Sequence, residues 1–234
     1  MSGFERRFLG IPGSMLTLLR PPGAYRAQGD TWLLAEALLD AALPAGARVL
    51  DIGCGTGALS VTAAEAGAGH VTAIDVSRRA ACATWLNARV RGHRVRVAVG
   101  DALDLAVDRG PFDVVLANPP YVPSAHRHPP RRGAARAWDA GHDGRALLDR
   151  ICAVAPVLLA PEGMLLLVHS ALCDVDKTLR QLRGGDLKTS VVARRDEPFG
   201  PVMRGRQALL ERRGLIEPGQ DYEELVVIRA DRAS

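Results

Sequence analysis

The stretch Arg48-Val49-Leu50-Asp51-Ile52-Gly53-Cys54-Gly55-Thr56-Gly57 decides the fold. Its first five residues predict a short buried strand, because they are mostly apolar and carry β-branched side chains. Three glycines at alternate positions come next, and residues 58–66 then predict a helix. Glycine lets a backbone turn sharply and approach a ligand, and a helix N-terminus offers free N–H groups. A strand, a glycine-rich turn and a helix in this order favour a nucleotide-type binding site in an α/β sheet, with a purely structural turn as the alternative.

The same alternation of strand and helix continues along the chain. Strands are predicted at residues 48–52, 70–74, 95–99, 112–117 and 164–168, and two late strands at residues 189–193 and 224–228. Helices are predicted at residues 32–43, 58–66, 79–91, 146–159, 174–183 and 207–213. Asp30 or Thr31 is the expected N-cap of the first helix. This alternation predicts an α/β fold, a Rossmann-like three-layer sandwich with a mostly parallel sheet and a late antiparallel strand.

The N-terminal segment differs from the rest of the chain. Residues 1–29 are irregular and rich in glycine and proline, whereas the strand and helix patterns begin only after them. We therefore expect an N-terminal arm over residues 1–29 and a single domain over residues 30–234.

The composition is that of a globular protein, with 47% hydrophobic and 24% charged residues among 234. A formal net charge of +4 permits an anionic partner without requiring one. No apolar run is long enough to span a bilayer, so no membrane association is expected. The four cysteines are scattered and form no C-x-x-C pair, which argues against a metal site or a disulfide framework. A reducing cytoplasm is the expected location.

Acidic residues come directly after the second and third predicted strands. Asp75 lies about twenty residues beyond the glycine turn, where a carboxylate can accept hydrogen bonds from ribose hydroxyls. Asp101 can receive an adenine amine, with a solvated turn aspartate as the alternative, and a loop is expected from there to residue 112. The G-x-G-x-G spacing differs from the G-x-G-x-x-G of dinucleotide sites, and the chain has no Gly-Lys-Ser/Thr after it. Both facts disfavour a nicotinamide oxidoreductase and a phosphate-loop protein.

The predicted strand at residues 112–117 ends on Asn118-Pro119-Pro120-Tyr121. Two prolines cannot continue a sheet ladder because they lack the N–H group, so a stiff loop is expected at the carboxyl end of this strand. Ligands bind at that edge of an open α/β sheet. The loop presents one carboxamide and one aromatic ring there; a rigid structural turn is the alternative.

These residues together resemble class I S-adenosylmethionine-dependent methyltransferases, and more narrowly the HemK-type protein glutamine methyltransferases and their amino-methylating relatives. Two further stretches add to the resemblance. Residues 25–31 are similar to the segment that folds over the cofactor in that family, and residues 138–144 resemble its Gly-Gly-x-Asp-Gly run, with Ala140 in place of the first glycine. The chain is closer in size to the short archaeal and eukaryotic type, which lacks the helical N-terminal domain of the bacterial enzymes.

The resemblance implies S-adenosylmethionine as cofactor and assigns roles to particular residues. The arm over residues 1–29 would act as a cofactor lid. The cofactor-binding residues that it implies are Gln28, Asp30, Thr31, Asp51, Gly53, Cys54, Gly55, Gly57, Asp75, Val76, Asp101, Ala102 and Asn118. The catalytic residues that it implies are Asn118, Pro119 and Tyr121.

The chemistry explains why such a reaction needs this loop. An amide or adenine nitrogen is a poor nucleophile, because its lone pair is delocalised. The side-chain oxygen of Asn118 and the carbonyl of Pro119 can accept its two N–H groups and orient it, while Tyr121 packs on the planar group. In-line positioning against a sulfonium methyl group can supply much of the acceleration. No metal and no strong base is implied, since the proton can leave to water.

The sequence indicates the methyl acceptor less specifically than it indicates the cofactor. By resemblance, the leading hypothesis is a glutamine amide in a protein such as a translation release factor, with a small activating subunit as a further partner. Methylation of adenine in DNA or RNA, or of a small metabolite, is the alternative; a non-catalytic cofactor-binding subunit is less favoured because Asn118 and Tyr121 are both present. The Arg- and His-rich loop at residues 126–136 can contact phosphates, although a solvated loop is the favoured interpretation because the run lacks interleaved aromatic residues.

Overall fold

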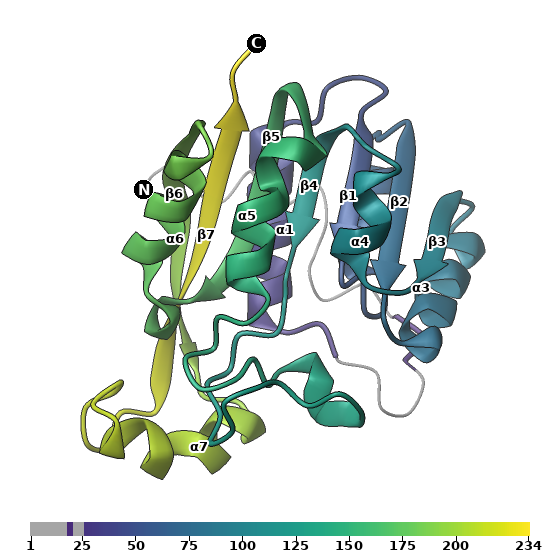
Figure 1. Cartoon of the computed structure of the whole chain (residues 1–234). Coiled ribbons are helices and arrows are strands. Elements are labelled where there is room, and N and C mark those ends of the chain that lie inside the picture. Colours follow the sequence, from purple (N-terminus) through teal and green to yellow (C-terminus); the bar gives the residue numbers. More distant parts are fainter. Residues whose placement is uncertain (1–17, 21–25) are drawn as a thin grey trace, which may run out of the picture.

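The computed structural model of the chain describes residues 18–20 and 26–234. Within these residues, seven strands form one sheet in the order β3-β2-β1-β4-β5-β7-β6 (Figure 1). The strands are β1 (Arg48–Ile52), β2 (His70–Asp75), β3 (Val95–Val99), β4 (Phe112–Ala117), β5 (Leu159–Ser170), β6 (Leu187–Pro198) and β7 (Tyr222–Arg232). The strands from β3 to β5 in this order are parallel, and β7 is antiparallel to both β5 and β6. The predicted Rossmann-like sheet is confirmed.

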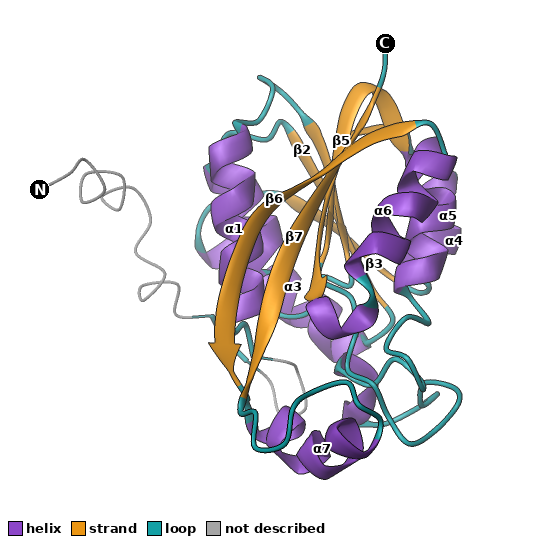
Figure 2. Cartoon of the chain, turned by 90° about the vertical axis from the view of Figure 1, so that its left-hand side faces the viewer, coloured by secondary structure: helices purple, strands orange, loops and turns teal. Residues whose placement is uncertain are grey.

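Helices cover both faces of the sheet and complete the three layers (Figure 2). The helices of the described residues are α1 (Gly29–Ala41), α2 (Ala58–Glu65), α3 (Arg78–Val90), α4 (Ala102–Val107), α5 (Leu148–Leu158), α6 (Val175–Gly184) and α7 (Pro201–Arg212). On one face α2 contacts both α1 and α3, and on the other face α5 contacts both α4 and α6. α7 lies beyond the carboxyl ends of the parallel strands, at the bottom of Figure 1.

The core is centred on β4 and β5. Val114 and Leu116 of β4 and Leu166 of β5 are fully buried. Parallel strands covered on both faces are apolar on both sides, which explains the continuous apolar runs in the sequence. Each such side chain stabilises the fold by about 1.5–3 kcal/mol. The strand that Asn118 directly follows is therefore anchored in the buried centre of the sheet.

A second, smaller core lies under α7. Its buried members are Val122, Phe199, Met203, Leu210 and Ile216. They come from the loop after β4, from α7 and from the turns on either side of it. This cluster fixes α7 against the segment that comes after the Asn-Pro-Pro-Tyr loop.

Several local predictions differ from the structure. The loop expected after Asp101 contains α4, which at six residues is too short to show a helical period. The predicted N-cap of α1 is wrong: Gln28 occupies that position, and the Asp30 carboxylate instead accepts hydrogen bonds from Thr31 and Tyr121. β5, β6, β7 and α7 are longer than expected, because pairing and packing extend them past their apolar centres.

The N-terminal arm lies largely outside the described residues, so its proposed role as a cofactor lid stays a prediction. No helix among the described residues is long and apolar enough to cross a membrane.

Candidate active site

The glycine turn after β1 leaves room for a ligand. Gly53, Gly55 and Gly57 all have positive φ angles, which L side chains rarely adopt. A Cβ atom on Gly57 would lie 2.9 Å from Thr84, so the third glycine is required by packing of α2 against α3. No heavy atom of the described residues lies within 4 Å of a Cβ atom built on Gly53. The turn is thus closed on the Gly57 side and open at Gly53.

Asp51, at the end of β1, has an unsatisfied oxygen beside this turn. The residue is fully buried, and the Ser60 hydroxyl donates to its Oδ2 at 2.5 Å. Its Oδ1 has no hydrogen-bond partner among the described residues. Burial raises the pKa of this carboxyl from 3.8 to about 7. Buried acceptors normally receive a hydrogen bond, and a polar ligand bound beside Gly53 would supply one to the Asp51 Oδ1. Together with the open turn, this acceptor shows that the residues present fit a cationic cofactor such as S-adenosylmethionine.

Asp75 lies across the turn from Asp51. Its carboxylate accepts a hydrogen bond from the Gly55 backbone at 2.9 Å and one from the Ser77 backbone at 2.7 Å. Burial raises its pKa, and the positive charge of Arg136 acts in the opposite direction. Arg136 belongs to the basic loop after β4, so this loop comes near enough to Asp75 for its charge to act on that carboxylate. Val76, the next predicted cofactor residue, is exposed.

Asp101 comes directly after β3 and is held differently. It caps α4 by accepting from the Leu103 backbone at 3.0 Å, and Arg150 of α5 donates to its Oδ2 at 2.9 Å. Partial burial raises the pKa of this carboxyl, but Arg150 and the backbone donors outweigh it and lower the pKa below its usual value. Asp101 is therefore ionised at neutral pH. Ala102 beside it is buried.

The loop after β4 is tied to the start of α1 by a chain of hydrogen bonds. The Asn118 side-chain N–H donates to the Thr31 hydroxyl at 3.1 Å, and that hydroxyl donates to Asp30 at 3.1 Å. The Tyr121 hydroxyl donates to the other Asp30 oxygen at 3.2 Å. Asp30 is buried and orients Tyr121 directly and Asn118 through Thr31. With its N–H group engaged, Asn118 keeps its Oδ1 as an acceptor for another molecule.

A pocket opens directly beside this loop. Its walls come from α1, the loop after β4, the facing ends of β6 and β7, and α7. The residues that line it are Gln28, Gly29, Asp30, Asn118, Pro119, Pro120, Tyr121, Val122, Ala137, Trp138, Glu197, Pro198, Gly200, Pro201, Val202, Met203, Glu223 and Leu225. The predicted residues Gln28, Asp30, Asn118, Pro119 and Tyr121 thus share one pocket, whereas Asp51, Asp75 and Asp101 do not line it. Sequence reasoning missed Glu197, Glu223, Val202 and Met203, because no motif links β6, β7 or α7 to the distant Asn-Pro-Pro-Tyr loop.

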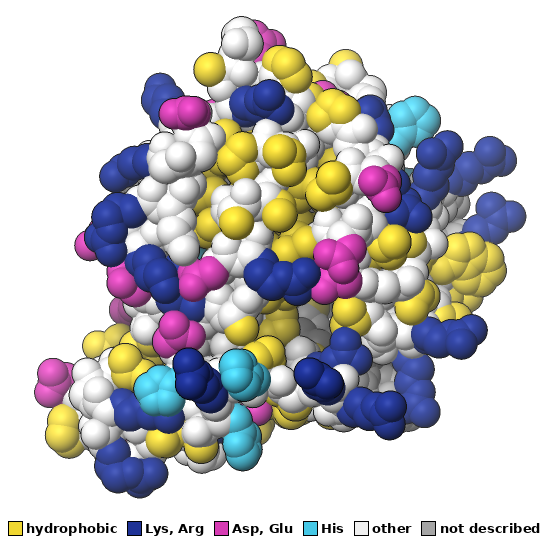
Figure 3. All heavy atoms as spheres, in the orientation of Figure 1, with side chains coloured by type: hydrophobic (Ala, Val, Ile, Leu, Met, Phe, Trp, Pro, Cys, Tyr) yellow, Lys and Arg dark blue, Asp and Glu magenta, His cyan; other side chains and the backbone are white. Residues whose placement is uncertain are grey.

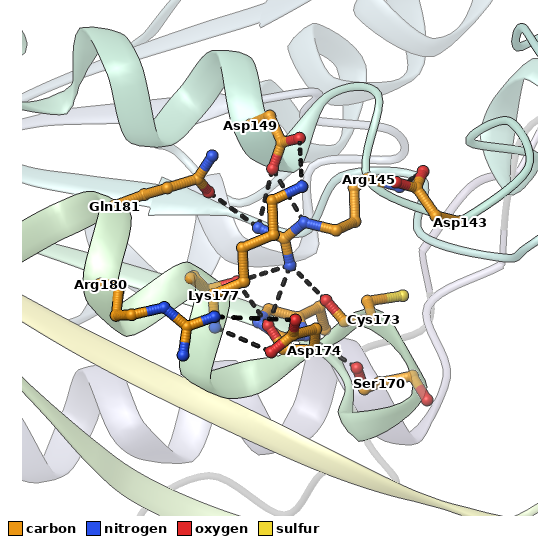
Figure 4. A network of polar contacts seen from close by, with 11 residues as sticks. Asp143, Arg145, Asp149, Ser170, Cys173, Asp174, Lys177, Arg180 and Gln181 are labelled. Atoms are coloured by element: carbon orange, nitrogen blue, oxygen red, sulfur yellow. Dashed lines mark hydrogen bonds and ion pairs between the residues drawn. The ribbon is translucent and has the colours of Figure 1, made fainter. Parts of the chain in front are cut away.

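A buried arginine supports the loop from behind (Figure 4). Arg145 is 2% exposed; it pairs with Asp149 at 2.8 Å and donates to the Cys173 carbonyl, to Thr178 at 3.0 Å and to Gln181 at 2.8 Å. The Cys173 thiol in turn donates to the Tyr121 carbonyl at 3.0 Å. The segment at residues 138–144 therefore leads into a network that holds the backbone of Tyr121.

The basic loop at residues 126–136 is mostly exposed. Figure 3 shows Arg, Lys and His side chains gathered over the lower part of the molecule, where this loop lies. A contact with nucleic acid through this loop stays a prediction. Among the described residues, no group of three or more His, Cys, Asp or Glu side chains is placed to hold a metal ion.

Comparison with known proteins agrees with this geometry. Residues 49–138 match a family model described as a methyltransferase domain. The solved E. cuniculi Mtq2–Trm112 complex, responsible for methylation of the eRF1 translation termination factor, has the same fold, with a TM-score of 0.60 and 22% identity over 90% of this chain and 99% of that chain. Fold and sheet-edge site define a class I S-adenosylmethionine-dependent methyltransferase.

Two relatives narrow the class. A putative protein N5-glutamine methyltransferase of Methanocaldococcus jannaschii is 30% identical over 182 residues, 78% of this chain and 90% of that protein. A release factor glutamine methyltransferase of Rhodospirillum rubrum is 37% identical over 144 residues, 58% of this chain and 44% of that protein. The chain belongs to the HemK-type methyltransferase family. The family and the enzyme class predicted from the sequence are therefore confirmed.

Proposed function

We propose that this enzyme transfers the methyl group of S-adenosylmethionine to the side-chain amide nitrogen of a glutamine in a protein. The observation that carries the proposal is the orientation of Asn118. Its N–H group is bound by Thr31, so its Oδ1 is available to accept an N–H group of the methyl acceptor. A planar amide nitrogen with two N–H groups needs two such acceptors, and the Pro119 carbonyl is suited to be the second.

The residues that we assign to the cofactor are not among those that line the pocket beside Asn118. We assign cofactor binding to the glycine turn at residues 53–57 and to Asp51, Asp75 and Asp101, which lie near the carboxyl ends of β1, β2 and β3. When bound, S-adenosylmethionine supplies an electrophilic methyl group on a sulfonium. The ionised Asp101 and the buried Asp75 can accept hydrogen bonds, and the unsatisfied Oδ1 of Asp51 favours a cationic donor.

The chain's own residues then act by orientation. Asp30 fixes Asn118 through Thr31 and fixes Tyr121 directly, so both side chains are positioned before the substrate arrives. An amide held in this way would present its nitrogen in a fixed orientation to a methyl donor bound by the glycine turn. Pre-positioning of two reactants can account for a large part of an enzyme's acceleration.

Asn118→Ala tests the proposed role of this residue. The variant loses one of the two acceptors for the amide, so turnover should fall by about 100-fold or more. S-adenosylmethionine affinity, measured by isothermal titration calorimetry, should stay within a few fold. Val202→Ala, in the α7 wall of the same pocket, serves as the control for a change in pocket shape. Undiminished turnover of Asn118→Ala would refute the role of this side chain.

The nature of the acceptor calls for a separate experiment. We infer a translation release factor as substrate, since relatives carry that name and the related complex methylates eRF1; the reaction would then take place in the cytoplasm. Labelled methyl transfer should be compared on a release factor, on the same factor with its acceptor glutamine changed to glutamate, and on DNA and RNA. Label on the unaltered release factor alone supports the proposal, and label on nucleic acid alone contradicts it.

We further propose that a small partner subunit increases activity, as the paired composition of the related Mtq2–Trm112 complex suggests. Turnover of the isolated chain should be compared with turnover after addition of a candidate subunit from the same source. Equal rates for the two samples would count against the need for a partner.

A further inference from the structure

The acceptor pocket is acidic. Asp30, Glu197 and Glu223 line it, and no Lys, Arg or His is among its described lining residues. Glu197 and Glu223 lie directly opposite each other in the antiparallel pair of β6 and β7. Like charges in directly opposed positions destabilise a sheet. An arrangement with such a cost, placed beside the loop that binds the acceptor, indicates a role in function.

Glu223 is the most buried of the pocket-facing glutamates. It is 6% exposed, and its Oε2 has no hydrogen-bond partner among the described residues. Burial raises the pKa of this carboxyl to about 7; a hydrogen bond from Ser170 opposes the shift, and the charges of Asp30 and Glu197 add to it. The Glu223 carboxylate can therefore take up a proton near neutral pH, and its Oε2 is available to accept a hydrogen bond from another molecule.

We propose that Glu223 accepts the proton that the acceptor nitrogen loses as it is methylated. The proposal rests on the function proposed above. The nitrogen–carbon bond forms while the carbon–sulfur bond breaks, and the electrons of that bond remain on sulfur. The electrons of the breaking N–H bond stay on nitrogen, the proton moves to the Glu223 carboxylate, and it later leaves to solvent. This replaces the sequence-based expectation that water alone receives the proton.

The acidic lining also selects the acceptor. A carboxylate side chain, or any anionic group, is repelled by three acids, whereas an amide offers N–H donors to them. The groups that face Glu223 are Asp30 from α1, Glu197 from β6, and Ser170 and Cys173 from the end of β5 and the turn after it. The acids among them disfavour ionisation of Glu223, so kcat/KM should rise with pH to a plateau above about 7.

The decisive experiment compares Glu223→Gln with Glu224→Gln. Glutamine keeps the size of the side chain and removes its capacity to take a proton. Glu224 is the next residue of the same strand, is paired with Arg194 instead, and does not line the pocket. On a glutamine-containing protein substrate at pH 8, Glu223→Gln should lower turnover by about 100-fold. Its S-adenosylmethionine affinity should be unchanged, and its melting temperature should be equal or higher because a buried charge is removed. Glu224→Gln should keep full turnover.

The outcomes separate the two proposals. If the wild-type enzyme modifies the glutamine substrate and Glu223→Gln does so equally well, the role of Glu223 is wrong and the proposed function stands. If the wild-type enzyme modifies no glutamine, both are wrong. Glu197→Gln provides a test that does not depend on the folding of Glu223→Gln: it should move the pH midpoint of kcat/KM to lower pH, and an unmoved midpoint would contradict the proposal.

Discussion

At the scale of the residue, the carboxyl group of Asp51 is fully buried, and burial raises its pKa to about 7. Its Oδ1 accepts no hydrogen bond from the described residues. Desolvation disfavours its ionised form, and a bound cation would favour it. The position of this side chain, at the end of β1 beside the open glycine turn, makes it suitable for testing the proposed cofactor site.

Asp51→Asn should weaken S-adenosylmethionine binding by about tenfold, since a hydrogen bond to a charged group contributes roughly 1.5–3 kcal/mol. Titration calorimetry measures this, with the exposed Asp40→Asn as the control. An unchanged dissociation constant would remove Asp51 from the cofactor site.

The same group predicts how stability depends on pH. Its folded-state pKa lies above the ordinary 3.8, so its contribution to stability is fully present below pH 3.8 and is lost as pH rises through about 7. Without cofactor, the wild-type protein should therefore lose more stability between pH 5 and pH 8 than Asp51→Asn does. Thermal unfolding at the two pH values, with and without S-adenosylmethionine, checks this sign; a larger loss in the variant would contradict it.

At the scale of the element, the loop after β4 depends on the turn at residues 141–145 that packs behind it. Gly144 has φ +74°, and a Cβ atom there would lie 2.3 Å from the Tyr121 carbonyl oxygen and 2.7 Å from the Cys173 sulfur. Ala140, where the family run has glycine, is buried with no positive φ angle, so a side chain is accepted. The glycine that this element requires is the one in close contact with Tyr121 of the Asn-Pro-Pro-Tyr loop.

Gly144→Ala should displace Tyr121 and reduce turnover, and should destabilise the protein by about 3 kcal/mol or more. Gly219→Ala is the matched control, since Gly219 has a similar φ of +81° but no atom of the described residues within 4 Å of the added Cβ. Gly219→Ala should destabilise the protein only by the cost of a non-glycine residue at a positive φ angle, about 1 kcal/mol. Denaturant unfolding gives both values. Equal effects of the two variants would show that contact with the loop is unimportant.

At the scale of the whole molecule, the two sides of the site come from different parts of the chain. The proposed cofactor side is formed around β1, β2 and β3, within the part that matches the methyltransferase domain. The acceptor pocket adds the ends of β6 and β7 and α7, which lie outside that match. Arg206 of α7 donates to both oxygens of Asp139, at 2.8 and 2.9 Å, and so links α7 to the loop after β4.

Leu210→Ala should therefore separate the two sides. Leu210 is fully buried in the small core under α7, and its truncation should cost about 2–5 kcal/mol. Turnover should fall because Met203 and Val202 of the pocket shift with α7, while S-adenosylmethionine affinity should stay within about twofold. Leu209→Ala, on a half-buried neighbour outside both cores, is the control. A parallel loss of cofactor affinity would show that the two sides are not independent.

Much of the fold was predictable because its information is local. The strands at 48–52, 95–99 and 112–117 have the predicted bounds, since apolar runs and glycine or proline residues mark their ends. α4 and the true start of α7 were missed, because short or polar helices are stabilised by tertiary contacts more than by a periodic pattern.

By itself, the sequence determined the central strands, the glycine-rich turn at residues 53–57 and the stiff loop after β4, because each depends on backbone preferences within a few residues. Only the tertiary structure decided what that loop faces. Asn118 binds Thr31 and Tyr121 binds Asp30 across 87 and 91 positions of the chain. Glu223 reaches the pocket through the antiparallel pairing of β6 and β7. Contacts between residues so far apart in the chain depend on how whole helices and strands pack against one another. A short sequence pattern does not predict that packing.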